Sequence, residues 1–241
     1  MIKLFLVGLL VFSFSFGKTV IVSAAANTQF AIKDIIKKFK QKNPQINIKL
    51  IISSSGKLAN QIANGAPYDV FISADTKYPQ FLYNLHKTAG KPKIYAYGIL
   101  VLWSIKKDLH SIYDITKPDI RKIAVANPKL APYGRETIKV LKYYNIYSKV
   151  RYKIVFGESI AQASQYIIKG LVDAGFTAKS IVLAPSLKDK GSWIEIDQKA
   201  YDPIAQAAVL INNDKEAKAF FDFLFSQEAK KILKRYGYKV P

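Results

Sequence analysis

The sequence predicts an α/β protein of two lobes, each a mostly parallel sheet flanked by helices. Strand and helix patterns alternate over residues 19–73, and a second alternating set occupies residues 123–177. Such alternation is typical of parallel strands joined by helical crossovers. Two apolar segments, 98–103 and 205–211, follow these sets, which indicates that the chain leaves the first lobe and later returns to it.

The first set opens with a short apolar strand that runs into Asn27, where we expect a helix to begin. Apolar residues then recur at helical spacing, and the segment that follows alternates apolar with other side chains as a strand does. The expected elements are strands at 19–23, 46–52 and 68–73, and helices from Asn27 to Asn43-Pro44 and from Gly56 to Asn64-Gly65.

The second set shows the same alternation. Pro132 fits the first turn of a helix, because its missing N–H would have no partner there. Ser159 and Gln162 form a capping-box pattern at the start of another helix. The expected elements are strands at 98–103, 123–126, 152–156 and 174–177, helices after Pro132 and from Ile160, a returning strand at 205–211, and C-terminal helices at 216–225 and 227–236.

Residues 1–17 have the pattern of a secretory signal peptide. Lys3 precedes an apolar run, Leu4–Phe16, and the segment closes with the small-x-small cleavage pattern Ser15-Phe16-Gly17. The run is too short to span a bilayer, and it lacks the turn signals of a first buried strand. We expect cleavage before Lys18 and export. Because the sequence has no cysteine, we expect neither a lipid anchor nor disulfides.

The rest of the chain is long enough for two lobes. Without residues 1–17, about 224 residues remain, enough for one large domain or two of about 100. No repeat, low-complexity segment or flexible linker is present, so the lobes are expected to be joined by crossing strands. We expect lobe I to comprise residues 18–97 plus 206–241 and lobe II residues 98–205.

The chain is strongly basic, with a formal net charge of +20 and a pI near 9.8. A charge of this size can indicate nucleic-acid binding. The lysines are instead spread along helical faces, as between residues 33 and 42, and no aromatic-basic motif of a nucleic-acid-binding module is present. We therefore expect solvated helix faces and a field that attracts small anions, with no nucleic-acid partner.

Donor side chains and open helix ends follow the strands at four places. Residues 51–61 read IISSSGKLANQ, a strand tip that brings three serines and a glycine to a helix N-terminus. Equivalent junctions carry Asn27, Tyr133 and Ile160. Each junction alone is explained as a helix cap. Because ligands bind at the carboxyl edge of open α/β sheets, two such junctions in each half predict an anion site.

The chain also resembles a known family. The resemblance rests on VSAAANTQF at 22–30, SSSGKLANQIANGAPYDVFISAD at 53–75, KIAVANPKLAPYG at 122–134, GESIAQA at 157–163, DAGFTA at 173–178 and FFDFLFSQEAKKILKRYGY at 220–238. This combination is similar to the periplasmic molybdate-binding proteins of ABC importers, which are class II substrate-binding proteins. It covers essentially the whole chain after residue 17.

The resemblance implies the two-lobed type II fold of periplasmic binding proteins, with a tetrahedral oxyanion held in a cleft between the lobes. It implies a periplasmic, monomeric protein that delivers molybdate or tungstate to a membrane permease. It also implies that the protein has no cofactor and is not an enzyme. The alternative is the same scaffold binding sulfate, thiosulfate or another tetrahedral oxyanion.

Carried over position by position, the family's donors are Asn27, Ser55, and the backbone N–H groups of Tyr133 and Ile160. These groups would contact the oxygens of the anion and not the metal atom. Asn27 stands where many members have serine, which keeps a donor but changes its reach. Ala178 stands where some members have a tyrosine that touches the oxyanion, and its loss bears on affinity and on the preference between molybdate and tungstate.

The chemistry of the anion agrees with this donor set. Molybdate, tungstate and sulfate are fully deprotonated dianions, so their ideal site offers only hydrogen-bond donors. Helix N-termini supply such donors with partial positive charge. A phosphate site would need an acceptor for the phosphate proton. We expect Glu158 to cap its helix or complement the helix dipole, and Arg135 to lie at the surface or behind the donors.

A secreted enzyme is the alternative from another class. The sequence contains neither a G-x-S-x-G elbow nor an H-E-x-x-H motif, and its two histidines, His86 and His110, are well apart. Asp69 and Asp75 would be the paired carboxylates of a hydrolase. They flank the strand at 70–73, so we expect them to serve as caps and turns.

Overall fold

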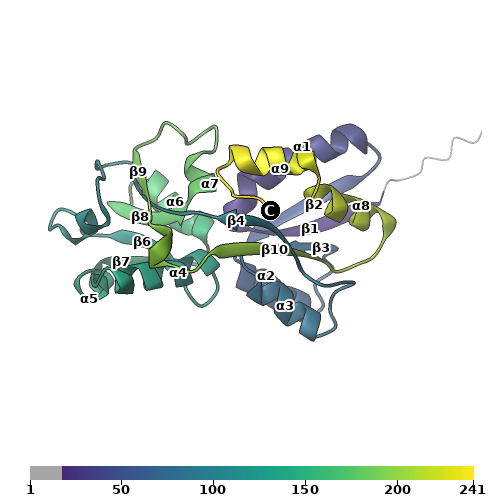
Figure 1. Ribbon diagram of the computed structural model, residues 1–241, viewed down its shortest axis with the longest axis horizontal. Coiled ribbons are helices and arrows are strands. Elements are labelled where there is room, and N and C mark those ends of the chain that lie inside the picture. The colour runs from purple at the N-terminus through teal and green to yellow at the C-terminus, as the bar shows by residue number, and fades with distance from the viewer. Residues whose placement is uncertain (1–17) are drawn as a thin grey trace, which may run out of the picture.

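The computed structural model describes residues 18–241, in which two five-stranded sheets lie side by side and are covered by helices (Figure 1). The predicted signal peptide, residues 1–17, lies outside the described residues. We refer to each sheet with its helices as a lobe, lobe I for the first sheet and lobe II for the second.

The sheet of lobe I has the strand order β2-β1-β3-β10-β4. Its strand β1 pairs in parallel with β2 and β3, whereas β10 pairs antiparallel with β3 and β4. The parallel pairs bring the carboxyl ends of three strands to one edge of the sheet. The bounds are Thr19–Ala25 for β1, Asn47–Ser53 for β2, Val70–Ile72 for β3, Lys93–Gly98 for β4 and Ile204–Leu210 for β10.

The sheet of lobe II repeats this plan, in the order β7-β6-β8-β5-β9. Strand β6 is parallel to β7 and β8, and β5 is antiparallel to β8 and β9. Each sheet is therefore mixed, because one strand, β10 in lobe I and β5 in lobe II, runs against its neighbours. The bounds are Leu100–Ser104 for β5, Ile123–Ala126 for β6, Ile154–Gly157 for β7, Ala174–Ala178 for β8 and Ser192–Glu195 for β9.

The helices cover both faces of each sheet. Those of lobe I are α1 Gln29–Lys42, α2 Ser55–Ala63, α3 Lys77–Asn84, α8 Lys215–Leu224 and α9 Gln227–Arg235. Those of lobe II are α4 Pro132–Tyr143, α5 Tyr147–Val150, α6 Ile160–Ile168 and α7 Lys179–Val182. Short 3₁₀ segments are η1 Ala26–Thr28, η2 Ile112–Thr116, η3 Arg151–Lys153 and η4 Gln198–Ala200. Within residues 18–241, no helix is long and apolar enough to cross a membrane.

The chain crosses between the lobes within one residue. The strand expected at 98–103 is β5, which begins at Leu100, and Gly98 is instead the last residue of β4 in the other sheet. A continuous apolar run does not reveal such a change of sheet. The sequence prediction also missed β4 and β9. Whether the lobes divide at residues 97/98 and 205/206 stays a prediction.

The C-terminal helices pack on α1 of lobe I. The Phe39 ring lies 5.3 Å from that of Phe220 and 5.4 Å from that of Phe223, between ring centroids. Arg235 donates to Asp34 over 2.7 Å at the end of the same interface. The last residues then reach toward lobe II, where the Tyr238 hydroxyl lies 3.0 Å from Ser180 Oγ. These contacts hold the end of the chain near the place where the lobes meet.

Candidate functional site

A small cavity lies where the carboxyl edges of the two sheets face each other. Its volume is about 10 Å³, far below the roughly 300–1,000 Å³ of pockets for drug-sized ligands. All four residues predicted as ligand donors line it, and none of its lining side chains is charged. The lining residues are Ala25, Ala26, Asn27, Ser54, Ser55, Ala74, Ala131, Pro132, Tyr133 and Ile160.

Two serines at the start of α2 bring their hydroxyls to this cavity. Ser55 is the first helical residue, and Ser54, with extended backbone, is the N-cap, so the helix begins one residue earlier than predicted. Ser55 Oγ accepts a hydrogen bond from the backbone N–H of Ala74 over 3.0 Å. Its own proton therefore remains available to a ligand. The Ser54 hydroxyl is buried without a protein partner.

Asn27 lies in η1 and not at the start of α1, which begins at Gln29. The turn places its side chain, which is only 1% exposed, between the cavity and a buried polar network. Its Nδ2 atom lies 3.0 Å from Gln206 Oε1 and 2.9 Å from the Tyr238 hydroxyl. Its Oδ1 atom is buried and has no protein partner.

Two helices of lobe II begin at the opposite wall. Pro132 is the first residue of α4 and Ile160 the first of α6. The first backbone N–H groups of a helix have no partner within it, so those of Tyr133 and Ile160 are free to bind an anion. The Tyr133 side chain takes no part in this, because its hydroxyl contacts Gln206 Nε2 at 3.1 Å.

The capping box expected at α6 is formed differently from the prediction. Ser159 Oγ accepts from the backbone N–H of Gln162, as expected. The Gln162 side chain, however, accepts from the N–H of Glu158 rather than from that of Ser159. The cap fixes the first turn of α6 without using the N–H of Ile160.

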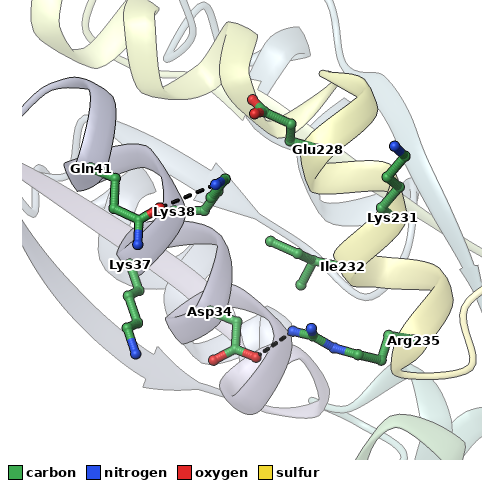
Figure 2. Close-up of a pocket in the computed structure, with 8 residues that line it drawn as sticks. All are labelled: Asp34, Lys37, Lys38, Gln41, Glu228, Lys231, Ile232 and Arg235. Carbon is green, nitrogen blue, oxygen red and sulfur yellow. Dashed lines mark hydrogen bonds and ion pairs between the residues drawn. The ribbon is translucent and has the colours of Figure 1, made fainter.

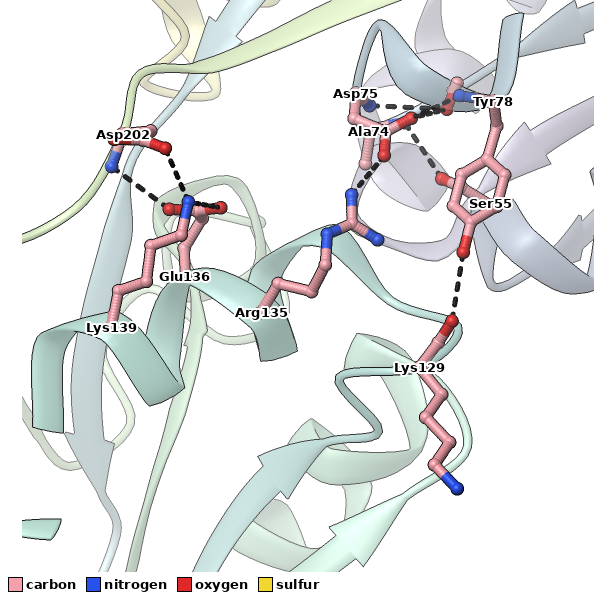
Figure 3. Close-up of polar contacts among 10 residues, drawn as sticks. Ser55, Ala74, Asp75, Tyr78, Lys129, Arg135, Glu136, Lys139 and Asp202 are labelled. Atoms are coloured by element: carbon pink, nitrogen blue, oxygen red, sulfur yellow. Dashed lines mark hydrogen bonds and ion pairs between the residues drawn. The ribbon is translucent and has the colours of Figure 1, made fainter. Parts of the chain in front are cut away.

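The lobes contact each other directly near the cavity, and Figure 3 draws two of these contacts. The backbone N–H of Gly56 donates to the carbonyl of Leu130 over 2.9 Å. The Tyr78 hydroxyl donates to the carbonyl of Lys129 over 3.0 Å, as Figure 3 shows. Lys57 of α2 pairs with Glu158 beside α6 at 2.7 Å. The structure is therefore in a closed state, with both lobes in contact around the site.

Arg135 forms a further bridge across the lobes. Its Nη2 pairs with Asp75 Oδ2, and the guanidinium lies 5.6 Å from the centre of the Tyr78 ring (Figure 3). Arg135 is not among the lining residues of the cavity, which agrees with a position behind the donors. Glu158 contacts Lys57 across the cleft, a role that sequence reasoning did not anticipate.

The two aspartates considered as paired carboxylates serve turns and loops. Asp69 accepts from the backbone N–H of Ile21 over 2.7 Å. Asp75 accepts from Ser73 Oγ over 2.9 Å, in addition to its pairing with Arg135. Neither lines the cavity. Residues 18–241 also contain no group of three or more histidine, cysteine, aspartate or glutamate side chains placed to hold a metal ion.

The electrostatics of the cavity come from backbone dipoles. No acidic residue lies in the first turns of α2, α4 or α6, so their positive ends are not neutralised there. Burial raises the pKa of the Tyr133 hydroxyl well above its usual value, so this group stays neutral. Ala178 is a buried residue at the end of β8 and offers no hydroxyl. The cavity thus suits a small anion that accepts hydrogen bonds.

A second hollow lies on the surface between α1 and α9 (Figure 2). It is wider than the cavity, and lysines and Arg235 line it together with the carboxylates of Asp34 and Glu228. Arg235 is already paired with Asp34, as Figure 2 shows. Its net charge is positive, but it is open to solvent and none of the four predicted donors lines it, so it is not the predicted anion site.

Sequence reasoning missed four polar residues that support the site: Ser54, Tyr95, Gln206 and Tyr238. The serine triplet at 53–55 was visible, but only the structure shows which hydroxyl lacks a protein partner. The other three come from distant strands and from the C-terminal segment. A polar residue inside an apolar strand, as Gln206 is in AQAAVLI, was the available signal.

The chain is similar to known binding proteins over most of its length. It is 37% identical to the molybdate-binding protein ModA of Rhodobacter capsulatus, over 91% of this chain and 87% of that protein. It is 35% identical to ModA of Azotobacter vinelandii, over 90% and 88%. The solved periplasmic molybdate-binding protein of Azotobacter vinelandii superposes with a TM-score of 0.86 at 32% identity, over 92% of this chain and 99% of that one.

The family assignment does not depend on these relatives alone. The model of one protein family matches residues 20–239, which include both sheets except Thr19 and every residue that lines the cavity. The two-lobed α/β architecture predicted from the sequence is also that of the solved relative. The chain therefore belongs to the bacterial extracellular solute-binding proteins.

Proposed function

We propose that this protein captures molybdate or tungstate outside the cytoplasm and delivers it to the membrane permease of an ABC importer. Relatives that are 35–37% identical over most of the chain bear the name of molybdate-binding proteins. The observation that carries the proposal is the small enclosed cavity, lined by hydroxyl and amide groups and by the first turns of three helices.

The ligand donors in this proposal are Asn27, Ser55, Tyr133 and Ile160. Lobe I contributes the side chains of Asn27 and Ser55, and lobe II contributes the backbone N–H groups of Tyr133 and Ile160. Each donor would contact an oxygen of the anion, so the metal atom has no direct protein ligand. Because donors from both lobes contact one ion, binding favours the closed state over an open one.

The same donors explain why a dianion without protons suits the site. Hydrogen bonds to a charged acceptor are shorter and about twice as strong as neutral ones. Enclosure removes the competing water, and the helix ends supply positive potential without a cationic side chain. Sulfate accepts hydrogen bonds from the same donors, so discrimination against it must come from the size of the cavity.

One calorimetric experiment tests the proposal. Purified protein without residues 1–17 is titrated with molybdate, tungstate, sulfate and phosphate. We expect tight binding of molybdate and tungstate with one ion per chain, and weak or no binding of sulfate and phosphate. If sulfate binds far more tightly than molybdate, the alternative cargo is correct.

Family membership also bears on the other functions considered. The relatives are solute-binding proteins of transporters, so the prediction that the chain is not an enzyme is confirmed. We further propose that the protein acts as a monomer without a nucleic-acid partner, with lobe I at residues 18–97 plus 206–241 and lobe II at 98–205. Cleavage of the signal peptide before Lys18 and the lack of a lipid anchor stay predictions from the sequence.

A further inference from the structure

A buried polar network lies directly behind Asn27. Gln206 of β10 is its centre: Oε1 lies 3.0 Å from Asn27 Nδ2 and 2.7 Å from the Tyr95 hydroxyl, and Nε2 lies 3.1 Å from the Tyr133 hydroxyl. The Tyr238 hydroxyl accepts from the same Asn27 Nδ2 atom over 2.9 Å. All five side chains are at most 4% exposed, so bulk water does not reach their hydrogen bonds.

The protons of this network do not match its acceptors as placed. The Tyr95 hydroxyl has one proton but lies 3.1 Å from the Ser73 carbonyl and 2.7 Å from Gln206 Oε1, both acceptors. Burial raises the pKa of Tyr95 well above its usual value, so the hydroxyl keeps that proton. Asn27 Oδ1 has no donor at all. The oxygens of an oxyanion in the cavity would be repelled by this acceptor oxygen.

Turning the Gln206 amide by half a turn removes the conflict at Tyr95. The two ends of an amide are nearly equal in size, so their hydrogen-bond partners decide which end is nitrogen. After the turn, Gln206 Nε2 donates to the Tyr95 hydroxyl, whose proton goes to the Ser73 carbonyl. Gln206 Oε1 accepts from the Tyr133 hydroxyl. Every proton between these groups then has one acceptor.

The turn of Gln206 forces the same turn at Asn27. Gln206 Nε2 would otherwise face Asn27 Nδ2 at 3.0 Å, with two donors in contact. Once turned, Asn27 Oδ1 accepts from both Gln206 Nε2 and the Tyr238 hydroxyl. That hydroxyl lies 3.0 Å from both the Asn27 carbonyl and Ser180 Oγ, and it gives up its donation to them. The Ser180 hydroxyl still donates to the Asn27 carbonyl over 2.8 Å. Nδ2 takes the position of the unpartnered Oδ1, the end of the amide that no protein group occupies.

We infer that Gln206, held between Tyr95 and Tyr133, is a positioning residue that turns the Asn27 amide so that Nδ2 faces the ligand and Oδ1 does not. This inference rests on the proposed oxyanion function and gives it a basis for selectivity. With Nδ2 in the cavity, the side chain offers only protons, which suits a fully deprotonated dianion. With Oδ1 there, it would accept the proton of hydrogen phosphate.

The first test observes the Asn27 amide directly. Protein labelled with ¹⁵N-asparagine is titrated with molybdate, and the Asn27 signals are assigned by their loss in Asn27→Ala. We expect the two Nδ2 protons to separate in chemical shift when molybdate binds, because one of them then donates to a charged oxygen. Signals of Nδ2 that do not move while molybdate binds would overturn the inference.

The second test measures selectivity. Tyr95→Phe keeps the ring but removes the hydroxyl that determines which way Gln206 turns. We expect molybdate affinity to fall about tenfold, the effect of losing one well-placed hydrogen bond. The affinity for hydrogen phosphate, measured by competition at about pH 8, where it is a dianion with one proton, should not fall. A merely structural role would lower both affinities by the same factor.

Tyr201→Phe is the matched control. Tyr201 is buried and its hydroxyl accepts from the backbone N–H of Leu100 over 3.2 Å, outside the network. We expect the ratio of the two affinities to stay at the wild-type value. An unchanged ratio in Tyr95→Phe overturns the inference. Failure of the wild-type protein to bind molybdate and tungstate would instead overturn the proposed function, so the two failures are distinguishable.

Discussion

At the scale of single residues, neighbouring side chains of the same type have different roles. Ser54 and Ser55 both line the cavity, yet only Ser55 accepts a hydrogen bond from the protein, at the N–H of Ala74. This bond fixes the Ser55 oxygen and leaves its proton for the ligand. Ser54 has no such constraint, so its hydroxyl can rotate. The sequence places both serines at the site but does not distinguish them.

Ser55→Ala should weaken molybdate binding strongly. The change removes one hydrogen bond to a charged group, worth about 1.5–3 kcal/mol, or roughly ten- to hundredfold in affinity. Isothermal titration calorimetry measures the effect. Ser23→Ala is the control. Ser23 is equally buried and does not line the cavity, and its hydroxyl donates to the Val70 carbonyl with a hydrogen bond of 3.1 Å. Equal losses of affinity in both variants would show that the effect is not specific to the site.

Asp114 provides a test of stability against pH. Its hydrogen bond from Lys117, together with the backbone N–H groups of His110 and Ser111, lowers the pKa of its carboxyl from 3.8 to about 2. Because the folded pKa lies below the unfolded one, the contribution to stability is present above about pH 4 and is lost as the pH falls toward 2. Urea unfolding should show Asp114→Asn less stable than wild type at neutral pH, with the difference shrinking over that range.

At the scale of elements, the site consists of strand ends followed by helix starts. The sequence predicted these junctions because caps, glycines and prolines act locally, and the structure brings all four together. It expected the chain to leave the first lobe at 98–103 but did not predict β4, the strand before this crossing. Nor did it predict the network behind Asn27, whose members Tyr95, Gln206 and Tyr238 are distant in sequence.

Gly56→Ala tests how closely α2 must approach lobe II. A Cβ at Gly56 would lie 2.5 Å from the Tyr78 hydroxyl and 3.0 Å from the Leu130 carbonyl. Both atoms take part in contacts between the lobes, so closure should be hindered and molybdate affinity should fall about tenfold, which corresponds to an overpacking cost of about 1–3 kcal/mol. The free energy of unfolding without ligand should fall less than the affinity. Opening relieves the contact with Leu130, and the better helix propensity of alanine, about 1 kcal/mol, offsets part of the contact with Tyr78 of the same lobe.

The matched control for this variant is Gly90→Ala. Gly90 has open space around its Cβ position and lies far from the cavity lining. The molybdate affinity of Gly90→Ala should equal that of wild type. If Gly56→Ala binds molybdate as tightly as Gly90→Ala, the contact between α2 and Leu130 does not limit closure.

At the scale of the whole molecule, the ligand and the contacts between the lobes should stabilise the same closed state. Asp75 lies in lobe I and Arg135 in lobe II, and their ion pair is partly buried, with side chains 13% and 27% exposed. Lys57 and Glu158 form a second pair, but both are about half exposed. Exposed pairs contribute about 0–1 kcal/mol, so the first pair should matter more.

Arg135→Gln should therefore lower molybdate affinity without removing any ligand donor. We expect a loss of about 1–2 kcal/mol, between that of an exposed pair and that of a buried hydrogen bond to a charge, or roughly five- to thirtyfold. Asp75→Asn breaks the same ion pair, so the double variant Asp75→Asn/Arg135→Gln should be little worse than either single variant. Lys57→Gln should change affinity less. Small-angle scattering with molybdate should still show closure in Arg135→Gln, because the four donors remain. Additive losses in the double variant would show that the two residues act separately and that their pairing does not hold the lobes together.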